Sequence, residues 1–181
     1  MVARGTIPRG WALAAQGQRE EGVAQMRQGL VALQAVGIEL ARPYALALLA
    51  EAYESMGQAA EGLRLLGEAL ALAHKYGACF HEAELNRLRG EWLLRQAVGA
   101  TGRSHLVAEA ETCFHQALDI ARHQEAKSLE LRAAMSLAHL WQRQSKRAEA
   151  QQLLAEIYGW FTEGFDTADL KEAKALLEEL S

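Results

Sequence analysis

Two short phrases, "CFHEA" and "CFHQA", each place a cysteine two positions before a histidine. Thiolate and imidazole are the usual zinc ligands, so Cys79, His81, Cys113 and His115 are the first candidates for a site with chemistry. The second phrase lies within a predicted helix, where residues two apart point about 200° away from each other. The two phrases also occupy different places in the repeat described below. The pattern therefore predicts no metal site, and no cofactor.

The most aromatic part of the chain, "IYGWFTEGFDTADLKEAKALLEEL", holds two aspartates that suggest an active-site loop. Carboxylates that act as acid and base need an enclosed cleft, and this segment gives no sign of one. Asp166 instead fits a helix N-cap, with Asp169 three residues later. Gly164 fits the left-handed end of the helix before it, and Phe165 with Leu170 fits a hydrophobic staple. We expect a capping helix at about 167–180, with one apolar face formed by Leu170, Ala173, Leu177 and Leu180.

Composition excludes several function classes. The formal net charge is -4 and the sequence pI is about 5.9, which gives no general attraction to nucleic acid or to anionic lipid. No apolar run approaches the length of a bilayer span, and the two cysteines suit a reducing cytoplasm. The chain has no nucleophile elbow and no glycine-rich phosphate loop. The sequence predicts a cytoplasmic protein that is not an enzyme.

An internal repeat runs along the chain. Setting "RGWALAAQGQREEGVAQMRQGLVAL" over "LAEAYESMGQAAEGLRLLGEALALA" aligns Gly22 with Gly62, 40 residues apart, and the same frame reaches Ala110 and Ala150. Glycine inside a helix costs roughly 1 kcal/mol relative to alanine, so its recurrence in register indicates a close contact between helices. Each repeat therefore reads as two antiparallel helices. The upstream helix of each pair is marked by a second small residue, in turn Gly10, Ala50, Gly90 and Ala138.

The repeat predicts an all-α solenoid of helical hairpins that forms a right-handed superhelix. It contains four repeats of about 40 residues and the C-terminal capping helix, in a single domain over 1–181. The third repeat is eight residues longer than the others, and we expect the extra residues in a loop between its two helices, within "QAVGATGRSHLVAE". The expected repeats lie at about 6–37, 43–77, 80–124 and 127–164.

The small-large-small spacing in "EEGVAQMRQGL", "AEGLRLLGEAL", "AEAETCFHQAL" and "AEAQQLLAEIY" resembles the tetratricopeptide repeat. The phrases "ARPYALALLAEAY" and "AKSLELRAAMSLAHLW", among others, are similar to the C-terminal repeat region of bacterial proteins that join a class III nucleotide cyclase to a signal-transduction ATPase. This resemblance implies a role for the repeat region in signalling. The cyclase and ATPase motifs themselves are missing from this chain.

The predicted function is a non-catalytic interaction module of a bacterial signalling system that binds a protein or peptide partner on a concave face. First helices form that face in helical repeats. The alternative interpretation of the same residues is a solvated charged surface that binds no ligand. The residues assigned to this partner-binding groove are Tyr44, Glu51, Glu54, Glu84, Arg87, Glu91, Arg95, Arg132, His139 and Arg143.

Two further hypotheses remain open. The module is alternatively a sensor that binds a small effector and regulates an attached ATPase or cyclase, which would need a closed apolar pocket with a few polar groups. The first repeat also lacks a preceding polar helix, so Ile7 and Trp11 are expected to be exposed. An exposed apolar patch often marks an interface, and the sequence therefore predicts a homodimer through the first repeat.

Overall fold

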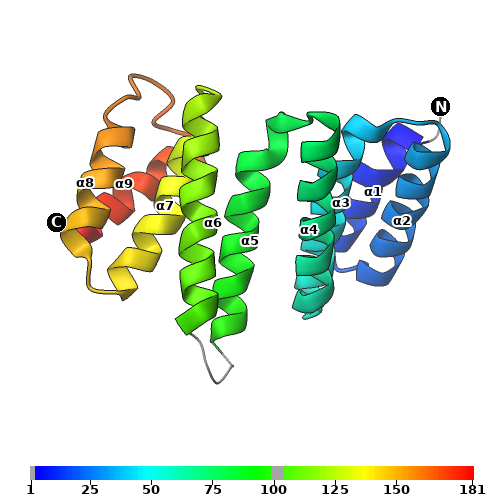
Figure 1. The fold of residues 1–181 in the computed structure, drawn as a ribbon, viewed down its shortest axis with the longest axis horizontal. Coiled ribbons are helices and arrows are strands. Elements are labelled where there is room, and N and C mark those ends of the chain that lie inside the picture. The colour runs from blue at the N-terminus through cyan, green and yellow to red at the C-terminus, as the bar shows by residue number, and fades with distance from the viewer. Residues whose placement is uncertain (1–2, 99–103) are drawn as a thin grey trace. The chain divides into compact units, whose positions relative to one another are not determined.

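The structure, a computed structural model, describes residues 3–98 and 104–181, and all regular elements in this part are helical. The chain forms two compact units, an N-terminal unit, Met1–Leu85, and a C-terminal unit, Asn86–Ser181. The helices of Figure 1 are α1 (Ala3–Ala15), α2 (Arg19–Ala35), α3 (Arg42–Ser55), α4 (Ala59–Tyr76), α5 (Glu82–Ala97), α6 (Ser104–His123), α7 (Lys127–Arg143), α8 (Arg147–Tyr158) and α9 (Ala168–Leu180), with short 3-10 helices η1 (Glu39–Ala41) and η2 (Cys79–His81) before α3 and α5.

The N-terminal unit is built from two hairpins, α1 with α2 and α3 with α4. The first hairpin is close because both helices carry glycine at the contact. A Cβ on Gly10 would lie 2.6 Å from the carbonyl oxygen of Gly22, and a Cβ on Gly22 would lie 2.4 Å from that of Gly10. In the second hairpin the equivalent residues, Ala50 and Gly62, are buried. The predicted reason for the helical glycines, close helix contact, is confirmed in the first hairpin.

Ile7 belongs to the core of this unit. It is only 5% exposed, and it lies over Gly29, where an added Cβ would come within 2.4 Å of the Cγ1 atom of Ile7. The prediction that Ile7 is exposed is therefore wrong. The physical reason is that α2 offers a glycine at this contact, so Ile7 of α1 packs closely against α2.

Residues in the left-handed region recur at the turns between helices. Gly17 and Gly57 follow α1 and α3 with φ of 94° and 75°, and Gly77 ends α4 with φ of 65°. In the C-terminal unit Glu125 and Ser145 take the same conformation with φ of 54° and 63°. Glycine adopts this conformation at no steric cost, whereas residues with a side chain, such as Glu125 and Ser145, adopt it at a steric cost.

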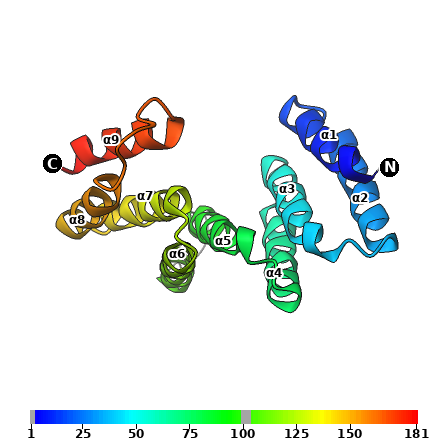
Figure 2. The same ribbon diagram turned by 90° about the horizontal axis from the view of Figure 1, so that it is seen from above.

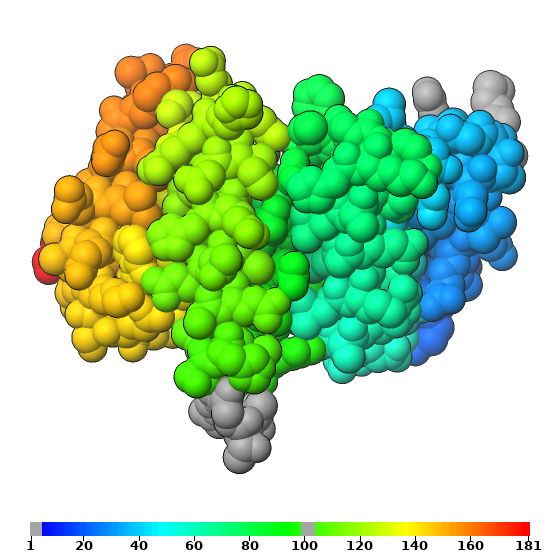
Figure 3. All heavy atoms as spheres, viewed as in Figure 1, coloured from blue at the N-terminus to red at the C-terminus, as the bar shows by residue number. Residues whose placement is uncertain are grey.

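The C-terminal unit contains the third and fourth hairpins and the capping helix. Residues of α5 from Asn86 onward pack on α6, where Gly90 makes room for Phe114: a Cβ on Gly90 would lie 2.5 Å from the Phe114 ring. The outward side of α6 faces the viewer in Figures 1 and 3. Helix α7 contacts both α6 and α8. The predicted all-α fold of helical hairpins with a C-terminal capping helix is confirmed, while the single-domain boundary stays a prediction.

The insertion of the third repeat lies only partly between its helices. Helix α5 ends at Ala97 and α6 begins at Ser104, whereas the gaps in the other hairpins are 16–18, 56–58 and 144–146. The segment "HLVAE" therefore belongs to α6 and not to a loop. The prediction that all eight extra residues lie between the helices is wrong, since part of the insertion lengthens the helices. Residues 99–103 of this stretch lie outside the described part of the chain.

Helix α9 packs on α7 and α8, as Figure 2 shows. Its buried residues are Leu170, Ala173, Leu176 and Leu180, so the prediction is wrong at one position, where Leu176 replaces Leu177. The N-cap is Thr167 and not Asp166, and α8 ends at Tyr158, well before Gly164. Thr167 instead donates its hydroxyl to the Gly164 carbonyl at 2.7 Å.

Arg147 forms hydrogen bonds with the C-terminal end of α9. Its Nε donates to the carbonyl oxygen of Leu180 at 3.0 Å, and its Nη2 donates to that of Glu179. A cation placed on the last carbonyls of a helix satisfies orphan acceptors and complements the helix dipole.

Among the described residues, no helix is both long enough and apolar enough to cross a membrane.

Candidate functional site

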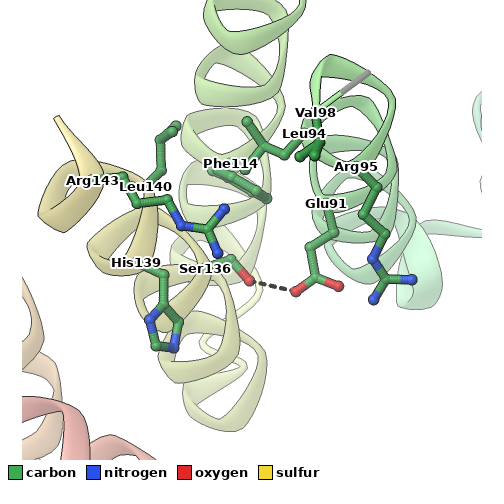
Figure 4. A pocket seen from close by; sticks show the side chains of 9 residues that line it. All are labelled: Glu91, Leu94, Arg95, Val98, Phe114, Ser136, His139, Leu140 and Arg143. Carbon is green, nitrogen blue, oxygen red and sulfur yellow. Dashed lines mark hydrogen bonds between the residues drawn. The ribbon is translucent and has the colours of Figure 1, made fainter. Parts of the chain in front are cut away.

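The predicted groove residues fall in both units. Tyr44, Glu51, Glu54 and Glu84 belong to the N-terminal unit, and the other six belong to the C-terminal unit. Four of those six line a single pocket of about 390 Å³ between α5, α6 and α7 (Figure 4). The four residues from the predicted set are Glu91, Arg95, His139 and Arg143, and the other residues that line the pocket are Leu94, Val98, Phe114, Ser136 and Leu140.

The pocket has an apolar floor with polar groups around it. Phe114 and Leu140 are buried, while Val98 and Arg143 are exposed at the rim. The side chains from α5 and Val98 occupy positions 91, 94, 95 and 98, and those from α7 occupy 136, 139, 140 and 143. Both sets follow the i, i+3, i+4, i+7 spacing of one helix face. Two helix faces therefore meet over the Phe114 ring.

Among the described residues that line this pocket, Glu91 is the only carboxylate, and its charge is compensated. Ser136 donates its hydroxyl to Oε1 of Glu91 at 3.0 Å, across the space between α7 and α5 (Figure 4). The guanidinium of Arg87 donates to the same oxygen. Arg87 is itself only 8% exposed, and its predicted role in partner binding stays a prediction. Arg132 does not line the pocket.

Arg143 carries the positive charge that faces the pocket. Its side chain extends from α7 toward α5 in Figure 4, whereas the guanidinium of Arg95 turns away from His139 and Ser136. Within the part of the chain that the structure describes, the side chain of Arg143 has neither an ion pair nor a hydrogen bond. A guanidinium without a carboxylate partner, beside an apolar floor, is suited to bind an anionic group such as a carboxylate.

The end of α7 that carries Arg143 is held by Glu111 of α6. This carboxylate accepts hydrogen bonds from Trp141 Nε1 at 2.7 Å and from Gln144 Nε2 at 3.3 Å, and Lys146 lies 3.5 Å away. Burial alone would raise the pKa of Glu111, but these hydrogen bonds and the charge of Lys146 outweigh it and lower the pKa. The ionised carboxylate therefore fixes the position of the last turn of α7.

Sequence reasoning missed the apolar half of this site. The pattern assigned Phe114 to the core, which is correct, but the ring also forms the pocket floor. The sequence could have indicated Leu94 and Val98 as pocket residues, because they follow Glu91 at helical spacing on the same helix face. Both apolar side chains are at least partly exposed. Ser136 had no signal in the sequence, since its role depends on the distance between α5 and α7.

The predicted residues of the N-terminal unit make different contacts. Trp11 is 41% exposed and donates its indole N–H to Oε2 of Glu51 at 3.0 Å. Tyr44 is exposed and stacks on His81, with ring centroids 4.9 Å apart. Burial lowers the pKa of His81 and so favours the neutral ring. Trp11 therefore lies beside Glu51, one of the residues of the predicted groove.

The cysteine and histidine phrases do not form a metal site. Cys79 is exposed at η2, and Cys113 is buried in α6, where burial raises the pKa of its thiol. His81 stacks on Tyr44, and His115 lies against Trp141 at 5.9 Å between ring centroids. Within residues 3–98 and 104–181, no group of three or more suitable side chains is placed to hold a metal ion.

Solved structures identify the fold. Two structures from Podosopora anserina, the nearly identical TPR-like repeats of a protein assigned as a kinesin light chain and a single-substitution variant of them, match 98% of this chain over 84% of their own length. Their TM-scores are 0.74 and 0.72, at 19% identity or less. The fold is that of TPR-like repeat proteins. No model of a known protein family matches the chain, and no curated protein matches it.

Proposed function

We propose that this chain is a non-catalytic TPR-like interaction module that binds an acidic segment of a partner protein in the pocket between α5, α6 and α7. The observation that carries the proposal is Arg143, a cation without a partner among the described residues, set beside Phe114 and Leu140. Helical repeats use such open faces to bind extended segments. A guanidinium pairs with a carboxylate through two parallel N–H···O bonds, and such charge-assisted bonds are stronger than neutral ones.

The pocket favours an acidic segment although one of its own residues is acidic. Ser136 and Arg87 already satisfy the carboxylate of Glu91, so the negative charge of Glu91 is balanced within the site. Arg143 then gives the rim a positive charge. This local charge is opposite in sign to the net charge of the whole chain, -4, which makes the rim a selective feature.

The acidic residues of the N-terminal unit suit the opposite partner chemistry. Glu51 and Glu54 lie on α3, and Glu84 lies at the start of α5. We propose that these carboxylates, with Trp11 and Tyr44, bind a basic part of the partner. Arginine and lysine side chains pair with carboxylates and also stack on aromatic rings.

A small effector is the second candidate for the same pocket. A volume of about 390 Å³ falls within the range of small-ligand sites, which is about 300 to 1,000 Å³. In that case the module would regulate an attached or partner ATPase or cyclase. Thermal-shift screening of the full chain against anionic metabolites distinguishes the two, because a small effector would stabilise the chain in the absence of any peptide.

The cellular setting is also part of this proposal. The resemblance of the repeat phrases to bacterial cyclase and ATPase proteins supports a role in bacterial signalling, and a content of only two cysteines is compatible with the cytoplasm. A homodimer through the first repeat now rests on Trp11 alone, since Ile7 is buried. Light scattering over a dilution series tests it, and a monomer mass at every concentration would reject it.

Selection from a random peptide library tests the proposed function without knowledge of the partner. The full chain is used as bait, and the Arg143→Glu variant serves as the counter-bait. We expect the peptides enriched on the wild-type chain to contain aspartate or glutamate, and we expect the variant to lose them. Enrichment of peptides without acidic residues, or equal enrichment on both baits, would reject the acidic segment as the ligand.

A further inference from the structure

A second pocket adjoins the first at the ends of α5 and α7. It has a volume of about 260 Å³ and shares Leu94, Val98, Leu140 and Arg143 with the first pocket. On the α5 side its lining begins at position 94 and not 91, and on α7 it begins at 140 and not 136. The second pocket therefore lies one helical turn, about 5 Å, further along both helices.

The walls of the second pocket are mainly aliphatic. Apart from Arg143 and Gln144, the described residues that line it are Leu94, Ala97, Val98, Val107 and Leu140. Ala97 and Leu140 are buried, whereas Val98 is 69% exposed, and Leu94 and Val107 are partly exposed. Apolar surface that is left in water favours contact with another apolar group. The second pocket therefore suits an apolar side chain.

Arg143 connects this pocket to the proposed ligand, because its side chain borders both pockets. An extended segment advances about 3.3 Å per residue, so a shift of about 5 Å corresponds to one or two residues. We propose that the second pocket receives an aliphatic side chain, such as leucine, carried one or two positions from the carboxylate that Arg143 binds. This inference rests on the proposed function and names a second feature of the partner segment.

The chemistry of the second pocket favours an aliphatic side chain over the other classes. A polar side chain would give up hydrogen bonds to water, and aliphatic walls offer none in return. An aromatic ring would gain no ring contact, since no aromatic side chain lines the second pocket among the residues that the structure describes. An aliphatic side chain gains from burial and loses no hydrogen bond.

Blocked peptides of the sequence Gly-Gly-Leu-Leu-Asp-Leu-Leu-Gly-Gly provide the test. Leucine stands at both positions on each side of the aspartate, so either chain direction places one leucine at the second pocket. In two matched peptides all four leucines become alanine, or the aspartate becomes asparagine. Binding to the full chain is followed by NMR titration. We expect the Leu peptide to bind about five- to tenfold more tightly than the Ala peptide.

Two variants of α6 locate the gain from leucine. Val107 lines the second pocket and not the first, so Val107→Phe should fill the second pocket and abolish the gain while the Ala peptide still binds at Arg143. Ala108→Phe adds the same ring at an exposed neighbour outside both pockets, and it should keep the gain. Dispersed amide spectra show that both variants are folded. In the wild-type chain, we expect nuclear Overhauser effects between leucine methyl groups of the peptide and the methyl groups of Val107.

The outcomes separate this inference from the function on which it rests. Equal affinity for the Leu and Ala peptides, or a gain from leucine that survives Val107→Phe, overturns the inference. A Leu peptide that binds more tightly without any Overhauser effect to Val107 also overturns it. In each of these cases the acidic segment stands if the Asp peptide binds more tightly than the Asn peptide. If the Asp and Asn peptides bind equally, or if no peptide binds, the proposed function fails and the inference fails with it.

Discussion

The backbones of Gly10 and Gly22 lie in direct contact, with room for a hydrogen atom and no more: a Cβ on Gly22 would stand 2.4 Å from the carbonyl oxygen of Gly10. Alanine at Gly22 must therefore push α1 away from α2. By contrast, an added Cβ at Gly67, on the exposed side of α4, meets nothing within 4 Å.

Alanine substitutions at Gly22 and Gly67 provide the first prediction. Gly22→Ala should lower the free energy of unfolding by about 1–3 kcal/mol through overpacking. Gly67→Ala should raise it by about 1 kcal/mol, because alanine is the better helix former. Chemical denaturation measures both. Similar changes of the same sign would mean that the close contact of α1 and α2 does not govern this hairpin.

The capping helix provides a second matched pair. Leu176 is 2% exposed, whereas Leu177 is only partly buried. Leu176→Ala should destabilise the chain by about 2–5 kcal/mol, as expected for a buried leucine, and Leu177→Ala should cost clearly less. If Leu177→Ala proves the more damaging change in a denaturation series, the register of α9 on α7 and α8 is wrong.

The left-handed turn residues allow a reciprocal exchange. Ser145 has φ of 63° at the turn between α7 and α8, where Gly57 has φ of 75° in the earlier hairpin. Ser145→Gly should stabilise the chain by about 0.5–1 kcal/mol, because relief of left-handed strain exceeds the added flexibility of the unfolded chain. Gly57→Ser should destabilise it. Melting temperatures that move in the opposite sense would refute this account of the turns.

Acid should weaken the contact between α6 and α7. Glu130 is 4% exposed and accepts hydrogen bonds from Arg122 at 2.9 Å and Lys127 at 2.8 Å. Burial raises its pKa, but these two bonds and charges outweigh burial and lower it. A lowered folded-state pKa stabilises the fold above the unfolded pKa of about 4.3, and this stabilisation is lost as the pH falls further.

Glu130→Gln tests this linkage. The variant should be less stable than the wild type at neutral pH, and its stability should fall less steeply as the pH drops below about 5. Denaturation curves at several pH values measure the slope. An unchanged slope would assign the acid sensitivity of the protein to other carboxylates.

The sequence predicts the hairpins well because close helix contact restricts residue type. Glycine is required at positions 10 and 22, where the backbones of two helices touch. It is also required at Gly90, which lies against the Phe114 ring. Register within the capping helix is harder to predict. Asp166 and Thr167 are both good N-caps, and Leu176 and Leu177 are adjacent, so either leucine could face α7 and α8. Only the fold resolves that choice.

The sequence predicts which pocket residues share a helix face, but it does not predict that the two faces form a pocket. Helical spacing places Glu91 with Arg95, and His139 with Arg143, on one face of α5 and of α7. Spacing along a helix gives no distance between helices, so the contact of Ser136 with Glu91 was not visible in the sequence. The same limit hid the burial of Ile7, since it depends on how closely α1 approaches Gly29.

The central claim is that Arg143 binds an acidic group of the partner, and the affinity of one selected acidic peptide tests it most directly. Its Kd is measured for the wild-type chain, for Arg143→Glu and for Lys171→Glu, an equal charge change at an exposed residue of α9. Arg143→Glu should weaken binding by about tenfold or more, which is about 1.4 kcal/mol, and Lys171→Glu should change it by less than about twofold. Equal losses in the two variants, or an unchanged Kd for Arg143→Glu, would contradict the account.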